Sequence, residues 1–549
     1  MGHSEPVRSI FYLFLFIIFA LCSCGIAGDG STETTVVWYG GGGQIGGSLA
    51  VVHSSGMNII VDCGALYNAE DDSRKQSAKK SVIPLPDDVI KGSALLLTHA
   101  HLDHCGRLPQ LVRAGFKQPI NTTPATRELL PVMLEMAIRY GSSDRTWYWS
   151  AKSVKQGSRG PFVTAHWREN CEWGQKISPV NRRQVQGNHD EVSKKEQVFL
   201  RPCDSCVEEE LRSILQLVQV REIGQVFPIS GHLNASFLAA GHIPGAASVL
   251  LAPSKSPEGK RLLFSGDIGN DLSPLECAPT PAPPADRIWL EATYGSDIRA
   301  KDATPELNRF RQEISTAVAN GEVVWIPAFA LDRTQKVLYQ LGLARNEGKL
   351  PSTIQVFCPS PSAAKVSAIY RRELSQPSTT HWFRPELYRI GPSAFPEMVR
   401  KLPGTLPRPS VLVTTSGMMD EAFSEDLLDD LLPQSTTRVL LVGWADPKTP
   451  AGLLASGAKK LEKRSRDDPN QIVQTIGVRA KVSQYKIFSA HADLSDTLYW
   501  LSRQDKRTEI RLVHGDPEQL AARQAALIKA GFLNVKIERA QQTKPISGK

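Results

Sequence analysis

The chain has 549 residues, of which 41% are hydrophobic and 22% charged, so it is long enough for two or three domains with sizeable cores. Its formal net charge of +8 favours anionic partners, but spread over this length the charge does not by itself indicate nucleic-acid binding. The nine cysteines are scattered and odd in number, which excludes a disulfide framework and favours a reducing compartment.

The N-terminus points to a different compartment. Residues 10–27 are continuously apolar, Arg8 precedes them and the acidic stretch "GDGSTE" follows them. This layout is typical of a secretory signal or a membrane anchor, and contact with a membrane is expected only if that reading is right. The alternative is that the start codon was chosen too far upstream and that the protein begins near Thr34. Residues 1–30 therefore carry no part of the fold prediction.

Short segments rich in β-branched and aromatic residues follow as far as about residue 295. "TTVVWYG", "MNIIVDCG" and "ALLLTHA" are examples, and their composition and flanking glycines predict strands. Beyond residue 295, "PELNRFRQEISTAVANG" predicts a helix, "EVVWIPAF" a buried strand and "DRTQKVLYQLGLARNEG" a second helix. This alternation indicates a parallel sheet of the βαβ type. Near the end, "EIRLVHGDPEQ" and "AALIKAGFLNVKIER" return to strand, helix and strand.

Two segments differ in amino-acid composition from the rest of the chain. Residues 141–200 are polar, aromatic and basic with little periodicity, which predicts a long insertion. Residues 456–466 form a basic run, "SGAKKLEKRSR", that we expect to be a helix or a loop.

Acidic residues and histidines recur at the carboxyl ends of the apolar runs. If these strands share a sheet edge, their side chains converge on one rim. Imidazole and carboxylate together suit zinc or manganese, and no cysteine joins the pattern. The residues that follow this rule are Asp62, His99, His242, Asp267, Glu291, His491 and His514.

The segment "LLLTHAHLDH" predicts more than one metal ion. His99 and His101 are two apart in extended chain, so they face the same way and can share one ion. Asp103 and His104 follow where the chain begins to look helical, which turns them towards a second position. Asp267 has two acceptor oxygens and is the natural bridge between two ions. Cleavage of phosphoesters by two metal ions needs such a pair.

These segments resemble a known family. "THAHLDH" is similar to the HxHxDH signature of the metallo-β-lactamase superfamily, and "LEATYG", "FSAHAD" and "LVHGDPE" resemble motifs of its β-CASP branch, especially the cleavage and polyadenylation type of RNA-processing nuclease. The resemblance implies an α/β fold, namely an αββα sandwich whose chain is interrupted by an inserted α/β β-CASP domain. The implied bounds are 34–296 for the first part of the sandwich, including the insertion at 141–200, then 297–486 for the β-CASP domain and 487–540 for the return segment.

The resemblance also implies a role for each site residue. The implied metal ligands are His99, His101 and His242 for one zinc ion, Asp103, His104 and His514 for the other, and Asp267 between the two ions. His491 would be the general acid, oriented by Glu291, and the two aspartates among the ligands would serve both metal binding and catalysis. Asp62 would support the site from behind. Arg333, Ser416 and Ser489 are the candidate contacts to substrate.

The implied function is zinc-dependent hydrolysis of RNA phosphodiester bonds in RNA processing or decay, with two zinc ions per chain and single-stranded RNA as substrate. The alternatives are a DNA nuclease, a small-molecule thioester or lactam hydrolase, and a scaffold without catalysis. A homodimer and an RNA-processing complex are both compatible with the resemblance. The resemblance implies the cytoplasm, whereas residues 10–27 imply export or anchoring.

Two positions depart from the family pattern. The family often reads "FALGRAQE" where this chain reads "FALDRTQK", which keeps Arg333 but replaces a glycine by Asp332. The chain reads "TPAG" at 449–452, where the family often has an arginine. These departures bear on substrate affinity and not on the metal ligands.

Overall fold

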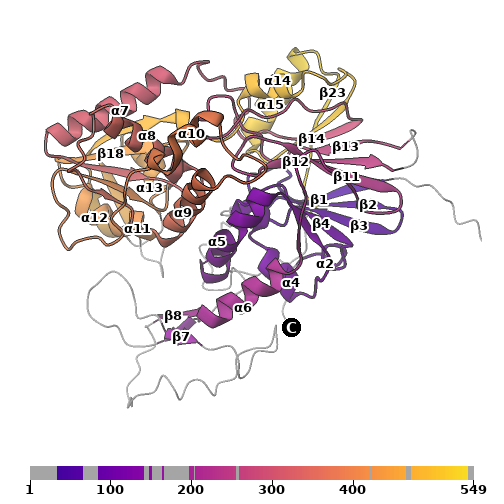
Figure 1. Ribbon diagram of the computed structural model, residues 1–549, viewed down its shortest axis with the longest axis horizontal. Helices are drawn as coiled ribbons and strands as arrows, with labels where there is room; N and C mark the ends of the chain where they lie inside the picture. Colours follow the sequence, from indigo (N-terminus) through magenta and orange to yellow (C-terminus); the bar gives the residue numbers. More distant parts are fainter. Residues whose placement is uncertain are drawn as a thin grey trace, which may run out of the picture.

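The computed structural model describes residues 34–65, 85–140, 148–150, 163–165, 197–202, 204–254, 259–420, 422–464 and 472–541. The expectations for residues 1–30 and for most of 141–200 lie outside these ranges. Among the described residues, no helix combines the length and the apolar character needed to cross a membrane. Figure 1 shows two bodies side by side, one built from the early and the last parts of the chain and one from its middle.

The first body contains two facing sheets. The first sheet has the order β1 (Thr35–Gly40), β2 (Leu49–Ser54), β3 (Met57–Val61), β4 (Ala94–Leu96), β5 (Ile120–Thr122) and β9 (Val218–Val220). The second has the order β10 (Val226–Pro228), β11 (Leu233–Ala239), β12 (Ala247–Pro253), β13 (Leu262–Phe264), β14 (Arg287–Glu291), β22 (Glu509–Val513) and β23 (Asn534–Ile537).

Strand periodicity explains why this body has layers. Successive strand residues face opposite sides, so Val52 packs between the two sheets whereas its neighbour Val51 packs in the core that includes Leu111 and Leu129 of the adjacent helices. These helices are α4 (Leu108–Arg113) and α5 (Pro124–Tyr140). The outer face of the second sheet packs in the same way against α14 (Leu494–Trp500) and α15 (Pro517–Lys529). The predicted αββα sandwich is therefore confirmed.

The second body is the inserted α/β domain. Its sheet has the order β16 (Val356–Phe357), β17 (Ser410–Thr414), β15 (Val323–Pro327), β18 (Thr437–Val442) and β21 (Lys481–Tyr485), and all four pairings are parallel. Its longer helices are α7 (Thr304–Ala319), α8 (Arg333–Asn346) and α9 (Pro361–Ser375). The chain then returns to the sandwich, where β22 pairs in parallel with β14. The predicted insertion is confirmed as a feature of the fold, while its exact bounds stay a prediction.

The remaining elements are short. The helices are α2 (Asp87–Ile90), α3 (Leu102–Cys105), α6 (Asp204–Leu215), α10 (Pro385–Ile390), α11 (Ala422–Asp426), α12 (Leu428–Leu431) and α13 (Pro450–Ala455), with 3-10 turns η3 (Gly391–Ala394) and η4 (Lys486–Phe488). Strands β6 (Tyr148–Ser150), β7 (Val163–Ala165) and β8 (Gln197–Pro202) form a small sheet, and β19 (Lys460–Arg464) pairs with β20 (Ile472–Gly477). The expectation of a helix or loop at 456–466 is wrong for β19, because Leu461 is buried opposite Ile476 of the partner strand.

A buried ion cluster joins the two bodies. Lys336, in α8 of the inserted domain, lies 2.8 Å from Asp332 and 3.3 Å from Glu276, which comes from the segment between β13 and β14 of the sandwich. All three side chains are at most 2% exposed. Two carboxylates against one ammonium leave a surplus negative charge, and burial raises the pKa of Asp332 to about 7 even though Lys336 opposes the shift.

The backbone at Asp332 is unusual as well. Its φ of 72° and ψ of −64° are rare for a residue other than glycine, which gives a physical reason for the glycine that the family pattern has at this position. Here the aspartate side chain offsets part of the strain by pairing with Lys336. The departure at position 332 therefore belongs to the same buried cluster as Lys336.

We predict that Asp332→Asn changes how stability depends on pH. Because the folded-state pKa of about 7 lies above the unfolded value, the stabilisation that the bound proton provides is complete below about pH 4 and is lost as pH rises through 7. From pH 5 to pH 8 the free energy of unfolding of the wild type should fall by roughly 1–4 kcal/mol relative to that of the variant. In the variant Lys336 still has its ion pair with Glu276. Denaturant unfolding at both pH values measures this difference. The exposed Asp87→Asn serves as control, and a constant difference between wild type and Asp332→Asn would contradict the assignment.

Candidate metal centre

The loop after β4 is fixed by the backbone around it. The Asp103 carbonyl accepts the Ser48 backbone N–H at 2.9 Å, and the His104 carbonyl accepts the Cys63 backbone N–H at 2.8 Å. Gly64 passes so close that a Cβ atom there would lie 1.6 Å from the Asp103 carbonyl oxygen, so only glycine fits. These backbone contacts of the first sheet therefore set the position of the histidine loop.

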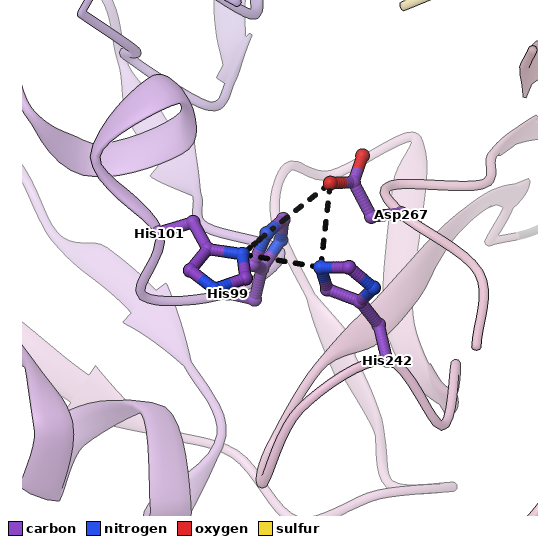
Figure 2. A group of neighbouring side chains, drawn as sticks. All are labelled: His99, His101, His242 and Asp267. Carbon is purple, nitrogen blue, oxygen red and sulfur yellow. Dashed lines mark hydrogen bonds and ion pairs between the residues drawn. The ribbon is translucent and has the colours of Figure 1, made fainter. Parts of the chain in front are cut away.

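Three imidazoles and one carboxylate converge above this loop (Figure 2). His101 Nδ1 lies 3.2 Å from His99 Nε2 and 3.1 Å from His242 Nε2. Asp267 Oδ2 lies 3.6 Å from His99 Nε2 and 3.5 Å from His242 Nε2. The loop after β4 supplies the first two histidines, and the loops after β11 and β13 supply His242 and Asp267. One sheet edge therefore faces the other across this group.

A second group shares Asp267 with the first. Its other oxygen, Oδ1, lies 3.2 Å from His104 Nε2 and 3.5 Å from His514 Nδ1. Asp103 Oδ2 lies 3.1 Å from His514 Nε2 and 4.0 Å from His104 Nε2. His514 follows β22, so the return segment completes this group, and its φ of 51° is one of few positive values outside glycine among the described residues. The two oxygens of one carboxylate thus face two separate clusters.

These separations fit metal ligands better than they fit hydrogen bonds. In a tetrahedral site with bonds of about 2.0–2.1 Å, neighbouring ligand atoms lie roughly 3.3–3.5 Å apart, which is close to the distances in both groups. His101 Nδ1 faces two imidazole nitrogens, His99 Nε2 and His242 Nε2, and as a single donor or acceptor it cannot satisfy both. Asp267 Oδ1 is buried and accepts no hydrogen bond of good geometry among the described residues. A cation in each group would satisfy these atoms.

The pKa shifts of His99, His242 and Asp267 also favour metal binding. Burial holds the pKa of His99 and of His242 well below the ordinary value, so both imidazoles are neutral and keep a lone pair for a metal. Burial alone would raise the pKa of Asp267, but the imidazoles of His514 and His104 hold it well below its ordinary range. The first group therefore presents neutral nitrogens beside an ionised carboxylate. In the second group burial would lower the pKa of His104 and of His514, but Asp267 beside them raises it above the ordinary value.

His491 lies beside both groups with Glu291. His491 Nδ1 is 3.2 Å from Glu291 Oε1 and 3.9 Å from Asp267 Oδ2, and its ring centroid is 4.4 Å from that of His242. Burial would raise the pKa of Glu291, but the contact with His491 lowers it, so the glutamate is an ionised acceptor. The imidazole is thus held through Nδ1, and Nε2 is its other nitrogen.

Asp62 lies behind the second group. Its carboxylate accepts the Thr98 backbone N–H at 2.8 Å and the Thr98 hydroxyl at 2.9 Å, and it lies 2.7 Å from His104 Nδ1. The φ of Asp62 is 61°, a strained value for a residue other than glycine that is typical of functional positions. The orientation of His104 therefore depends on a residue on the far side from Asp267.

Several residues that support the site were not predicted from the sequence. The Asn270 side-chain amide donates to the backbone carbonyls of Ser489 and His491, and Arg299 donates to the His491 carbonyl. Thr293 Oγ1 lies 3.1 Å from His514 Nδ1. These contacts involve backbone carbonyls and residues distant along the chain, so no spacing in the sequence indicates them.

The three predicted substrate contacts fall into two places. Ser489 is buried beside the metal centre and accepts the His491 backbone N–H at 3.3 Å. Ser416 donates to Asp420 at 2.9 Å and accepts the Met418 backbone N–H at 3.0 Å. Arg333 begins α8 with its guanidinium over Phe329. Within the described residues, no hydrogen bond or ion pair joins Ser416 or Arg333 to the two groups.

Comparison with known families agrees with this architecture. The model of the metallo-beta-lactamase superfamily matches residues 43–180, the model of the Beta-Casp domain matches 334–454, and the model of the Zn-dependent metallo-hydrolase RNA specificity domain matches 475–537. The three models match in the same order as the first part of the sandwich, the inserted domain and the return segment. The chain belongs to the β-CASP branch of the metallo-β-lactamase superfamily.

Relatives of this β-CASP protein include proteins of bacteria, archaea and animals. A ribonuclease of Thermus thermophilus is 27% identical, over 89% of this chain and 94% of its own length. An RNase J-like protein of Methanocaldococcus jannaschii is 26% identical over 88% of this chain and 92% of its own. The cleavage and polyadenylation specificity factor 73 of Drosophila melanogaster is 23% identical, over 89% of this chain but only 60% of its own length. Membership of this metallo-hydrolase family implies a divalent metal, which the two groups of ligands can hold.

We predict that removing bound metal destabilises this β-CASP protein. A ligand that binds only the folded state adds roughly 3 kcal/mol at a hundredfold excess over Kd, so chelation should lower the midpoint of thermal unfolding by several degrees. His99→Ala should abolish most of the shift that added metal produces, since it removes a buried ligand. His232→Ala, an exposed histidine outside both groups, should keep the full shift. Equal melting with and without chelator would contradict a metal centre here.

Proposed function

We propose that the protein is a ribonuclease with two zinc ions that hydrolyses phosphodiester bonds of single-stranded RNA. The observation that carries the proposal is the pair of adjoining histidine and aspartate groups that share Asp267, with the His491–Glu291 pair beside them. A small-molecule hydrolase would need no such inserted domain over the site. A scaffold would have no need of the complete set of ligands.

The proposed ligands are those of the two groups described above. His99, His101 and His242 would hold one zinc ion, Asp103, His104 and His514 the other, and Asp267 would contact both. When bound, the ions would supply Lewis acidity toward the phosphodiester and toward the attacking water. Asp62 and Thr98 would keep His104 turned toward its ion, because they occupy its Nδ1.

His491 is the proposed general acid. Glu291 accepts from Nδ1 and stabilises the protonated imidazole, so Nε2 can give its proton to the leaving oxygen of the RNA. Asn270 and Arg299 fix the loop by donating to the backbone carbonyl of His491. Proton transfer by a positioned histidine contributes typically 10²–10⁴-fold to the rate.

The inserted domain would hold the RNA strand across the site. We propose that Arg333 contacts the RNA backbone, whereas Ser489 acts through its bond to His491. Ser416 is the weaker candidate, because its hydroxyl already bonds within its own loop. RNA processing or decay is the proposed role. The domain bounds of 34–296, 297–486 and 487–540, and assembly as a homodimer or within an RNA-processing complex, remain proposals.

We predict that His491→Ala lowers the turnover number on end-labelled single-stranded RNA by about 10²–10⁴-fold while both zinc ions are retained. The zinc is counted by mass spectrometry after dialysis, so loss of the acid is distinguished from loss of the centre. His232→Ala is the matched control and should cleave like the wild type. The length of the products then separates endonuclease from exonuclease action.

Two outcomes would contradict the proposal. Unchanged cleavage by His491→Ala would remove the histidine from the reaction. Two bound zinc ions without cleavage of RNA by the wild type would exclude a ribonuclease, and tests with single-stranded DNA, a thioester and a chromogenic lactam would then distinguish the alternative hydrolases from a scaffold.

A further inference from the structure

Three loops of the inserted domain meet at one edge of its sheet. Strands β17, β15 and β18 are adjacent and parallel, so the loops after them emerge at the same edge. These loops carry Gly417, Phe329 and Gly443 respectively. In open parallel sheets, ligands bind in the crevice outside the carboxyl ends of the strands. A ligand is therefore expected at this edge on topology alone.

Arg333 brings an unpaired positive charge to this edge. Its guanidinium carbon lies 4.9 Å from the centre of the Phe329 ring. On another side it rests against bare backbone, since a Cβ atom on Gly443 would lie 2.8 Å from that carbon. Within the described part of the chain, the half-buried guanidinium makes no hydrogen bond or ion pair. A guanidinium is always charged, and a partly desolvated one without a partner is costly unless an anion binds there.

An exposed tryptophan, Trp444, belongs to the same loop as Gly443. It directly follows Gly443, is 42% exposed, and makes no hydrogen bond or ring contact with any residue that the structure describes. Phe329 is 36% exposed as well. Aromatic faces beside a cationic group are the usual means of binding single-stranded nucleic acid, since bases stack on the rings and phosphates contact the cation.

The cluster also lies close to the metal centre. Tyr294, three residues past Glu291, has its ring centroid 6.2 Å from that of His491. Burial lowers the pKa of Arg333, while Tyr294 and Asp332 raise it, so the tyrosine lies in the neighbourhood of both the guanidinium and the proposed acid.

We propose that Arg333 and Trp444 form a nucleotide subsite of the ribonuclease, in which the guanidinium binds one backbone phosphate and the indole stacks on the adjoining base. Phe329 holds the guanidinium in place. The inference rests on the proposed function and adds a subsite that selects a stacked, single-stranded nucleotide near the cleavage point. A base-paired nucleotide has its faces covered and cannot use it.

The test measures binding separately from cleavage. Fluorescein-labelled single-stranded RNA of twelve nucleotides is titrated with the zinc-loaded full chain in the His491→Ala background, and anisotropy gives Kd. Adding Trp444→Ala should weaken binding about tenfold, and Trp444→Phe should restore most of it. Adding Arg333→Gln should weaken binding and reduce the salt dependence by about one released counterion. Tyr499→Ala removes an aromatic side chain that is 56% exposed on α14 and should bind like the parent.

An abasic scan locates the stacked base. Removing the base at one position should weaken binding by the parent about as much as Trp444→Ala does, and the two changes together should cost no more than one alone. If Trp444→Ala binds the intact RNA and every abasic RNA as tightly as the parent does, the subsite is overturned and the ribonuclease proposal still stands. A parent chain that binds no RNA at all would overturn both.

Discussion

The structure depends on the position of one carboxylate. Asp267 is 2% exposed, and its two oxygens face two clusters of imidazoles from different parts of the chain. A buried carboxylate is stable only among compensating charges or donors. A divalent metal, which these groups of ligands can hold, would supply that compensation. The second sheet, the histidine loop and the return segment must therefore all meet at the same point for the fold to be complete.

This requirement explains the order of the chain. The first sheet provides the histidine loop, the second provides His242 and Asp267, and His514 follows the inserted domain in the chain. Parallel pairing of β22 with β14 fixes the register that brings His514 to the second cluster. The inserted domain is tied to the sandwich by the buried cluster around Lys336, so this domain has a defined position relative to the metal centre.

Much of this could be predicted from the sequence, because strand periodicity and the positions of histidines at strand ends are local features. The strand that ends before His99 and the helix after Asp332 appear where the pattern indicates them. The sequence could not reveal that Glu276 pairs with Lys336, or that Asn270 holds the His491 carbonyl, since these contacts join distant segments without periodicity. Strand β19 was not predicted, because its sequence KLEKR is mostly charged and the buried Leu461 alone gives no strand periodicity.

We propose that Asp267 joins two metal ions. X-ray absorption at the zinc edge, on protein loaded with two zinc ions per chain, tests it most directly. We predict nitrogen and oxygen ligands at about 2.0–2.1 Å and a zinc–zinc distance of roughly 3.5–4 Å that is lost in Asp267→Ala. A spectrum with isolated zinc and no second metal within that distance, or one unchanged by the substitution, would contradict it.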